Sequence, residues 1–112
     1  MIKDIKIDQE VAVVSLEGSL DVSQQKDFKT QIMNVAEKQE KDIVLDFSSV
    51  NFIDSSCLGA LVAVTKTLQS AEGDIKLSHL SDDVRSIFQI TRLDKIFEIY
   101  DDNKQAVEAF YR

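Results

Sequence analysis

The sequence is poor in the residues that bend, break or cross-link a chain. It contains no proline, three glycines and one cysteine, Cys57. A lone cysteine rules out an internal disulfide and is typical of a reducing compartment. Because no proline-rich or glycine-rich stretch marks a linker, we expect residues 1–112 to form a single domain. That length is enough to bury a core without metals or disulfides.

Long apolar runs and basic charge are also scarce. No run approaches the roughly 20 apolar residues of a membrane-spanning helix, and the N-terminus lacks the apolar core of a signal peptide. We therefore expect a cytoplasmic protein with no membrane insertion. Thirteen basic residues stand against twenty acidic ones, for a net charge of −7. Such a surface repels phosphate backbones, which argues against a direct nucleic-acid partner and favours a protein partner with a basic patch.

Hydrophobic spacing in the first part of the chain predicts two strands and a helix. Residues 2–7 and 11–16 are apolar or alternating on either side of a polar turn, which indicates an antiparallel hairpin that Gly18 closes. Asp21 is placed to cap a helix that runs to about Glu40. The apolar face of that helix consists of Phe28, Ile32, Val35 and Ala36.

The rest of the chain alternates strands with helices. The continuous apolar run at residues 43–47 is the pattern of a central strand covered on both faces. A helix follows from about Ser55 to Ala71, and Gly73 is expected to end it as a left-handed residue. The later elements are a strand at 75–79, a helix capped by residues 81–83, an edge strand at 96–100 and a terminal helix opened by Asp101 and Asp102. This order predicts an α/β fold with about four helices and a mixed sheet of four or five strands, beginning with a hairpin.

Several kinds of catalytic site lack the residues they need. There is no glycine-rich phosphate loop, and His79 is the only histidine, so neither a nucleotide cradle nor a zinc site is expected. A serine hydrolase needs a base beside its nucleophile, yet His79 ends a different strand from the serine-rich segment. Asp21, Asp46 and Asp54 could form a carboxylate site at strand ends, but such residues are more often caps. We therefore expect neither an enzyme nor a cofactor or metal site.

The segment Asp-Ser-Ser-Cys-Leu-Gly at residues 54–59 places two hydroxyls at a strand-to-helix junction. Unpaired N–H groups and positive helix-dipole potential gather there, so a serine could be a cap, a nucleophile or a phosphate acceptor. If Asp54 is the N-cap and accepts from the N–H groups of Ser56 and Cys57, Ser55 becomes the first helical residue and faces solvent. A phosphate on Ser55 would gain from the helix dipole but lie beside a like charge, changing the surface more than the fold.

The helix that follows this segment is apolar around most of its circumference. A stripe from Leu58 to Leu68 is expected to face the sheet. Small residues cover much of the remaining face, which predicts a docking patch; the alternative is a helix buried on both sides within the monomer. We favour docking, with a partner surface that comprises Asp21, Asp54, Ser55, Ser56, Cys57, Leu58, Gly59, Ala60 and Ala63.

Three segments carry a resemblance to a known family. They are Gly18–Asp21 at the end of the second strand, Asp54–Gly59 at the start of the central helix, and Leu77–Phe88. Together they resemble the STAS domain, and within it the stand-alone bacterial anti-sigma factor antagonists. The resemblance covers essentially the whole chain at matching spacings, and the central segment is its most specific part. It implies a STAS-like fold.

The resemblance also implies a partner-switching protein that regulates sigma-factor-dependent transcription. In that family the serine directly after the motif's aspartate, here Ser55, is phosphorylated by the cognate anti-sigma factor, an ATP-dependent serine kinase. The unphosphorylated antagonist binds the anti-sigma factor and frees the sigma factor, and a PP2C-type phosphatase resets the cycle. A phosphate of about −1.5 to −2 charge can disrupt a packed interface by repulsion and desolvation, which fits this role. A monomer is the expected free state.

Two positions depart from the family pattern. Cys57 stands where the family usually has glycine, and its side chain could crowd an approaching kinase or add redox sensitivity. Arg92 replaces the glycine of a common Thr-Gly-Leu segment, so Arg92 would bear the cost of a left-handed helix end there. Two alternatives stay open. One is a constitutive STAS scaffolding subunit of a transporter or stress-signalling complex without a phospho-switch; the other is a small hydrolase that uses Ser55 or the aspartates.

Overall fold

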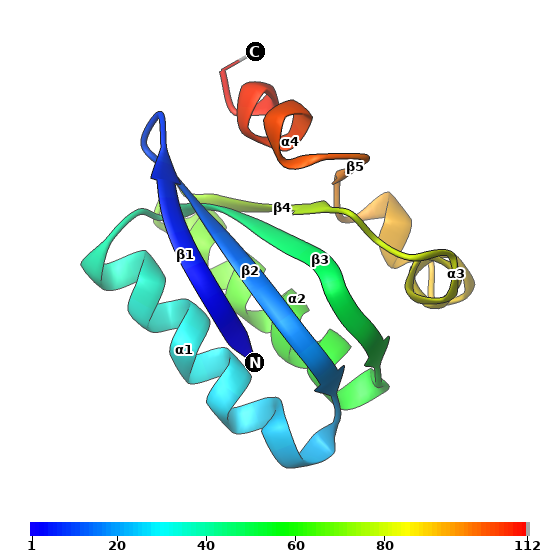
Figure 1. Ribbon diagram of the computed structural model, residues 1–112. Coiled ribbons are helices and arrows are strands. Elements are labelled where there is room, and N and C mark those ends of the chain that lie inside the picture. Colours follow the sequence, from blue (N-terminus) through cyan, green and yellow to red (C-terminus); the bar gives the residue numbers. More distant parts are fainter. Residues whose placement is uncertain (112) are drawn as a thin grey trace.

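The computed structural model describes residues 1–111 as a five-stranded sheet with helices on both faces (Figure 1). The strands are β1 (Ile2–Asp8), β2 (Val11–Leu20), β3 (Asp42–Ile53), β4 (Asp74–Ser78) and β5 (Ile99–Tyr100). They follow one another across the sheet in chain order. The β1–β2 pair is antiparallel and every later pair is parallel, which confirms the mixed α/β sheet with its N-terminal hairpin.

The helices are distributed unequally over the two faces of the sheet. They are α1 (Gln25–Lys38), α2 (Ser55–Ser70), α3 (Asp82–Ile90) and α4 (Asn103–Ala109), with short 3-10 helices η1 (Val22–Gln24) and η2 (Leu93–Lys95). The first three α-helices pack on one face, around a core that includes Phe28, Phe47 and Phe88. Among the helices of residues 1–111, only α4 covers the other face (Figure 1), through Ala106 and Val107.

The central strands are apolar on both sides because both faces are covered. Ile43 and Leu45 face the large core, whereas Val44 belongs to the small core under α4. All three side chains are fully buried, and burial of each stabilises the fold by about 1.5–3 kcal/mol. The continuous apolar run therefore predicts a central strand correctly.

Two strands run further than their apolar patterns indicate. Gly18 does not close β2 but lies inside it, with φ +86° next to an irregularity in the β2–β3 register. The strand β3 continues from its apolar run through Ser48 and Ser49 to Ile53. Backbone pairing with β2 maintains this extension although its polar side chains are exposed. The β1–β2 turn is formed by Gln9 and Glu10, both with positive φ, as two-residue hairpin turns require.

The irregular backbone positions differ in part from the expected ones. The left-handed residue after α2 is Glu72, with φ 65°, and not Gly73. Gly73 is instead needed for close packing, because a Cβ there would lie 2.5 Å from the backbone oxygen of Lys41. His79 lies outside β4 with φ 57°, and β5 is limited to Ile99–Tyr100. The predicted left-handed helix end at Arg92 is confirmed by its φ of 64°.

Candidate functional site

Neighbouring parallel strands bring Asp21 and Asp54 to the same end of the sheet. Asp21 follows β2 and caps η1, where its Oδ1 accepts from the N–H of Ser23 at 3.0 Å. Asp54 follows β3, and its own N–H donates to the backbone oxygen of Leu20 at 3.0 Å. Asp46 lies in the interior of β3, away from both caps. Within residues 1–111, no group of three or more His, Cys, Asp or Glu side chains is arranged to hold a metal ion.

Asp54 caps α2 and fixes the position of Ser55. Its Oδ1 accepts from the hydroxyl of Ser56 at 2.6 Å and from the N–H of Cys57 at 3.1 Å. These two hydrogen bonds hold the pKa of the Asp54 carboxyl below its usual value, so it stays ionised as a cap. Ser55 is the first residue of α2 and is exposed, as the cap assignment predicts.

Cys57 lies inside the protein at this junction. Its side chain is fully buried, and Sγ donates to the backbone oxygen of Asp21 at 3.2 Å. The expectation that it could crowd an approaching kinase is therefore wrong. Burial, followed by the negative charge of Asp54, raises the pKa of the thiol, which disfavours the reactive thiolate. Cys57 connects the end of β2 to the start of α2.

The predicted docking face of α2 is largely buried within the monomer. Cys57, Leu58 and Ala60 are between 0% and 4% exposed, in part because α1 packs alongside α2 (Figure 1). The prediction that these three side chains form an exposed patch is wrong, because all three belong to the large core. Of the predicted surface on α2, Ser55 and Gly59 are exposed, and Ser56 and Ala63 are partly exposed.

An apolar groove begins beside Ser55. It has a volume of about 350 Å³ and lies between the first turns of α2 and the segment that joins α3 to η2. Its lining consists of Ser55, Leu58, Gly59, Val62, Thr91 and Leu93. Sequence analysis did not identify the α3–η2 side of this groove. The sequence signal that could have located this side is Arg92 at a position where the family usually has glycine, because the left-handed turn at Arg92 immediately precedes Leu93.

Large apolar side chains are exposed at positions close in the chain to Asp21, Asp54 and the groove residue Thr91. Ile90, in the last turn of α3, is 82% exposed. Val22 follows Asp21 and is 69% exposed, and Phe52 near the end of β3 is 46% exposed. Ile90 directly precedes Thr91, which lines the groove, and an exposed apolar side chain beside an apolar groove is typical of a protein–protein contact surface.

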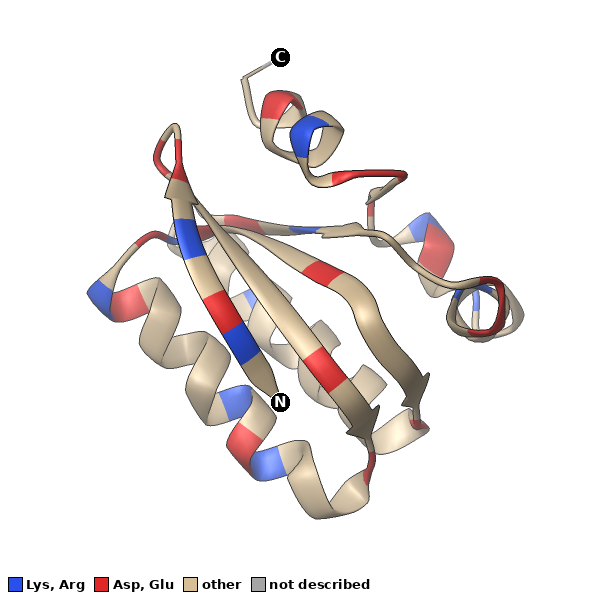
Figure 2. Ribbon diagram, viewed as in Figure 1, with Lys and Arg blue, Asp and Glu red and all other residues tan. Residues whose placement is uncertain are grey.

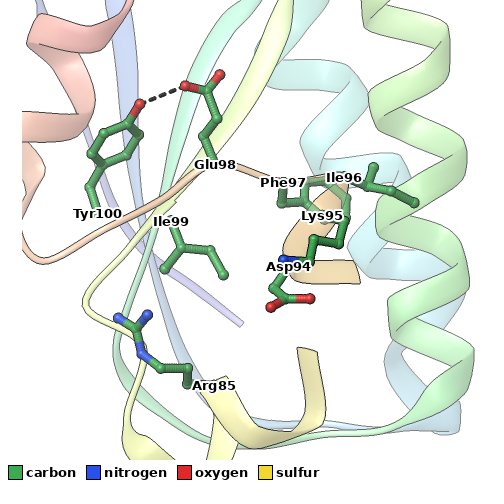
Figure 3. Close-up of a pocket in the computed structure, with 8 residues that line it drawn as sticks. All are labelled: Arg85, Asp94, Lys95, Ile96, Phe97, Glu98, Ile99 and Tyr100. Carbon is green, nitrogen blue, oxygen red and sulfur yellow. Dashed lines mark hydrogen bonds between the residues drawn. The ribbon is translucent and has the colours of Figure 1, made fainter. Parts of the chain in front are cut away.

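A second cavity of about 460 Å³ lies between α3, η2 and β5 (Figure 3). Arg85 and Asp94 point into the same space, and the hydroxyl of Tyr100 donates to Glu98 at 2.6 Å. Arg85 also lies 3.9 Å from the carboxylate of Asp101. This cavity has charges of both signs and shares no lining residue with the Ser55 groove, so the two are separate features.

None of the helices in the described chain, residues 1–111, is long and apolar enough to cross a membrane.

Comparisons with known proteins agree with one another. The STAS domain model matches residues 3–106. A Thermotoga maritima protein named as a candidate anti-sigma factor antagonist is 30% identical over 108 residues, which is 96% of each chain. The anti-sigma-B factor antagonist of Bacillus subtilis is 29% identical over 96 residues, covering 86% of this chain and 87% of that protein. A crystal structure of a candidate anti-sigma factor antagonist from Thermotoga maritima has a TM-score of 0.88 at 28% identity, covering 97% of this chain and 94% of that chain.

Proposed function

Because the chain belongs to the STAS domain family, among its anti-sigma factor antagonists, we propose that it switches partners through phosphorylation of Ser55. The unphosphorylated protein binds a cognate anti-sigma factor that is also a serine kinase, and thereby frees a sigma factor. Phosphorylation of Ser55 releases it, and a PP2C-type phosphatase restores the binding form. The Bacillus subtilis relative is an anti-sigma-B factor antagonist, which supports an anti-sigma factor as the partner. In this role the protein is a binding module and not an enzyme.

The observation that carries the proposal is the position of Ser55 on the rim of the apolar groove. Its side chain is exposed, so a kinase can reach it, and Ser55 also lines the groove. A partner that fills the groove must remove water from Ser55. A hydroxyl tolerates this by making a hydrogen bond, whereas a phosphate of about −1.5 to −2 charge does so only at a high desolvation cost.

The cap geometry explains why phosphorylation would change binding more than folding. The Oδ1 atom of Asp54 already accepts from Ser56 and Cys57, so the start of α2 is capped without any contribution from Ser55. A phosphate on Ser55 gains from the helix N-terminus and is repelled by the ionised Asp54. These two effects oppose each other within the monomer. The main consequence is then a new negative charge on the contact surface.

The proposal is tested with purified protein, the cognate kinase and ATP, by counting phosphates with intact-mass spectrometry and measuring binding by calorimetry. We expect one phosphate on the wild-type chain and none on Ser55→Ala. Ser70→Ala, at the other end of α2, is the matched control and should accept one. Ser55→Asp should weaken anti-sigma factor binding by at least about tenfold, which corresponds to about 1.4 kcal/mol, whereas Ser55→Ala should bind nearly as the wild type does.

Two results would contradict the proposal. Undiminished phosphate incorporation into Ser55→Ala would place the modification elsewhere. Equal partner affinity of Ser55→Asp and the wild type would remove the switch and leave a constitutive scaffolding role.

A further inference from the structure

The strand β1 forms one edge of the sheet and has an open outer side. It runs for seven residues, from Ile2 to Asp8, and pairs with β2 alone among the strands of residues 1–111. The opposite edge, β5, has only two residues. A long edge strand without proline presents unpaired N–H and C=O groups that can pair with another strand.

The helix-facing side of β1 also leaves apolar surface uncovered. A groove of about 280 Å³ lies between β1 and α1, where Ile2 and Ile5 meet Val35. Ile7 lies two residues after Ile5, on the same side of the strand, and is 51% exposed. The rest of the groove is lined by Gln31, Asn34, Lys38 and Gln39. The edge therefore combines a free backbone with an apolar strip and a rim that carries no negative charge.

The opposite side of β1 carries charges of alternating sign. Asp4, Lys6 and Asp8 are paired in register with Ser15, Val13 and Val11, on the face that α4 covers elsewhere. Figure 2 shows Lys and Asp residues following each other along this strand. With Lys3, the two lysines and two aspartates cancel, whereas the chain as a whole carries −7. The β1 edge is a neutral strip on an acidic molecule, so the strands in contact add no net repulsion of their own.

In place of the monomer expected from the sequence, we propose that β1 pairs antiparallel with β1 of a second copy of this chain, about a two-fold axis through Ile5. The two sheets of five strands would then form one continuous sheet. Such a pairing keeps the helices of both copies on the same side of the joint sheet. Residues that lie opposite each other must then come from the same face of β1, so allowed registers differ by shifts of two residues.

Overlap and charge together favour one of these registers. A register centred on Ile7 would also pair Lys6 with Asp8, but it overlaps only residues 6–8 of β1, whereas the register centred on Ile5 overlaps residues 2–8. Centred on Ile5, the pairing places Asp4 opposite Lys6 of the second copy, twice by symmetry, and Ile5 opposite Ile5. Centred on Asp4 or on Lys6, it places like charges directly opposite each other, which destabilises a strand pair. The Ile5-centred register also brings the two apolar grooves together beside the axis.

This interface is independent of the proposed switch. The Ser55 groove lies between α2 and the segment after α3, whereas β1 and its groove with α1 lie at the other edge of the sheet (Figure 1). A dimer formed through β1 therefore presents two open Ser55 surfaces. Failure of either proposal leaves the other standing.

Sedimentation equilibrium on the purified chain tests the pairing. We expect the wild type to reach the dimer mass at chain concentrations below about 1 mM. Lys6→Asp and Asp4→Lys each create two like-charge contacts and should raise the dimer dissociation constant by about tenfold or more. The double variant Asp4→Lys/Lys6→Asp reverses both charges and should restore the wild-type constant. Lys66→Asp, an equal charge change on the exposed side of α2, is the matched control and should leave the dimer unaffected.

Three outcomes would overturn the inference. The first is a wild-type chain that stays monomeric up to about 1 mM. The second is a Lys6→Asp variant that dimerises as the wild type does. The third is a double variant that has the circular dichroism spectrum of the wild type but no restored dimer, since the exposed Asp4 and Lys6 leave folding intact.

Discussion

Aspartate side chains serve different purposes at the strand-to-helix junctions and inside the sheet. Asp21 and Asp54 are local caps, which accept hydrogen bonds from residues two or three positions further along the chain. Asp46 instead binds across the fold, to Asn103 in α4. Cys57 also acts across the fold, because its thiol reaches the backbone of Asp21. The local contacts follow from sequence spacing, whereas the distant ones depend on how the sheet brings residues together.

The Asp46 carboxylate should make stability depend on pH. Burial raises its pKa, but hydrogen bonds from Asn103 at 3.0 Å and from the N–H of Ser48 at 2.9 Å outweigh burial and hold the pKa below its usual value. A depressed folded-state pKa stabilises the fold above the unfolded-state value, about 3.9, and this stabilisation is lost as pH falls through the folded-state pKa.

We therefore expect Asp46→Asn to lower the free energy of unfolding by about 1–3 kcal/mol at neutral pH. The difference from the wild type should begin to shrink below about pH 4, where the carboxyl of the unfolded chain becomes protonated, and should be lost as pH falls through the lower folded-state pKa. Urea unfolding of both proteins across this range measures it. A difference that does not change with pH would show that the charge of Asp46 contributes nothing.

At the scale of elements, apolar periodicity predicted all five strands and all four α-helices, because buried faces repeat along the chain. It did not predict the polar extension of β3, which backbone pairing holds. It also assigned the left-handed residue after α2 to Gly73, although Glu72 takes that conformation. Cap rules placed Ser55 correctly. The Leu93 side of the groove was missed because it reaches α2 only through tertiary packing.

Gly59, inside α2, and Gly73, just after its end, give a matched pair of glycine-to-alanine substitutions. A Cβ on Gly59 meets nothing within 4 Å, so Gly59→Ala within α2 should raise the free energy of unfolding by about 0.5–1 kcal/mol. A Cβ on Gly73 would lie 2.5 Å from the Lys41 oxygen, so Gly73→Ala should lower it by about 1–3 kcal/mol. Chemical denaturation of both variants measures the difference. Effects of the same sign would disprove the packing role of Gly73.

At the scale of the whole molecule, the two faces of the sheet have unequal cores. The α1–α3 side holds the large aromatic core and also builds the Ser55 groove. The other side has a small core around Val11, Val13 and Val44, which α4 covers. Because α4 has seven residues, its stability depends on this docking more than on its own helical hydrogen bonds. The proposed contact surface around Ser55 is thus built on the layer with the larger core.

Local opening of α4 should be detectable without unfolding of the rest. Asn103 holds the start of α4 to the sheet, where its Nδ2 donates to Asp46 and its Oδ1 accepts from Ser78. Asn103→Ala removes a hydrogen bond to a charged group. The rate at which the backbone amides of α4 exchange with solvent should therefore rise by about tenfold or more. The exchange rates of the backbone amides of Ile43, Leu45 and Phe47, whose side chains lie in the large core, should change much less. Hydrogen exchange followed by NMR separates the two groups, and equal acceleration in α4 and β3 would mean that α4 opens only when the whole molecule unfolds.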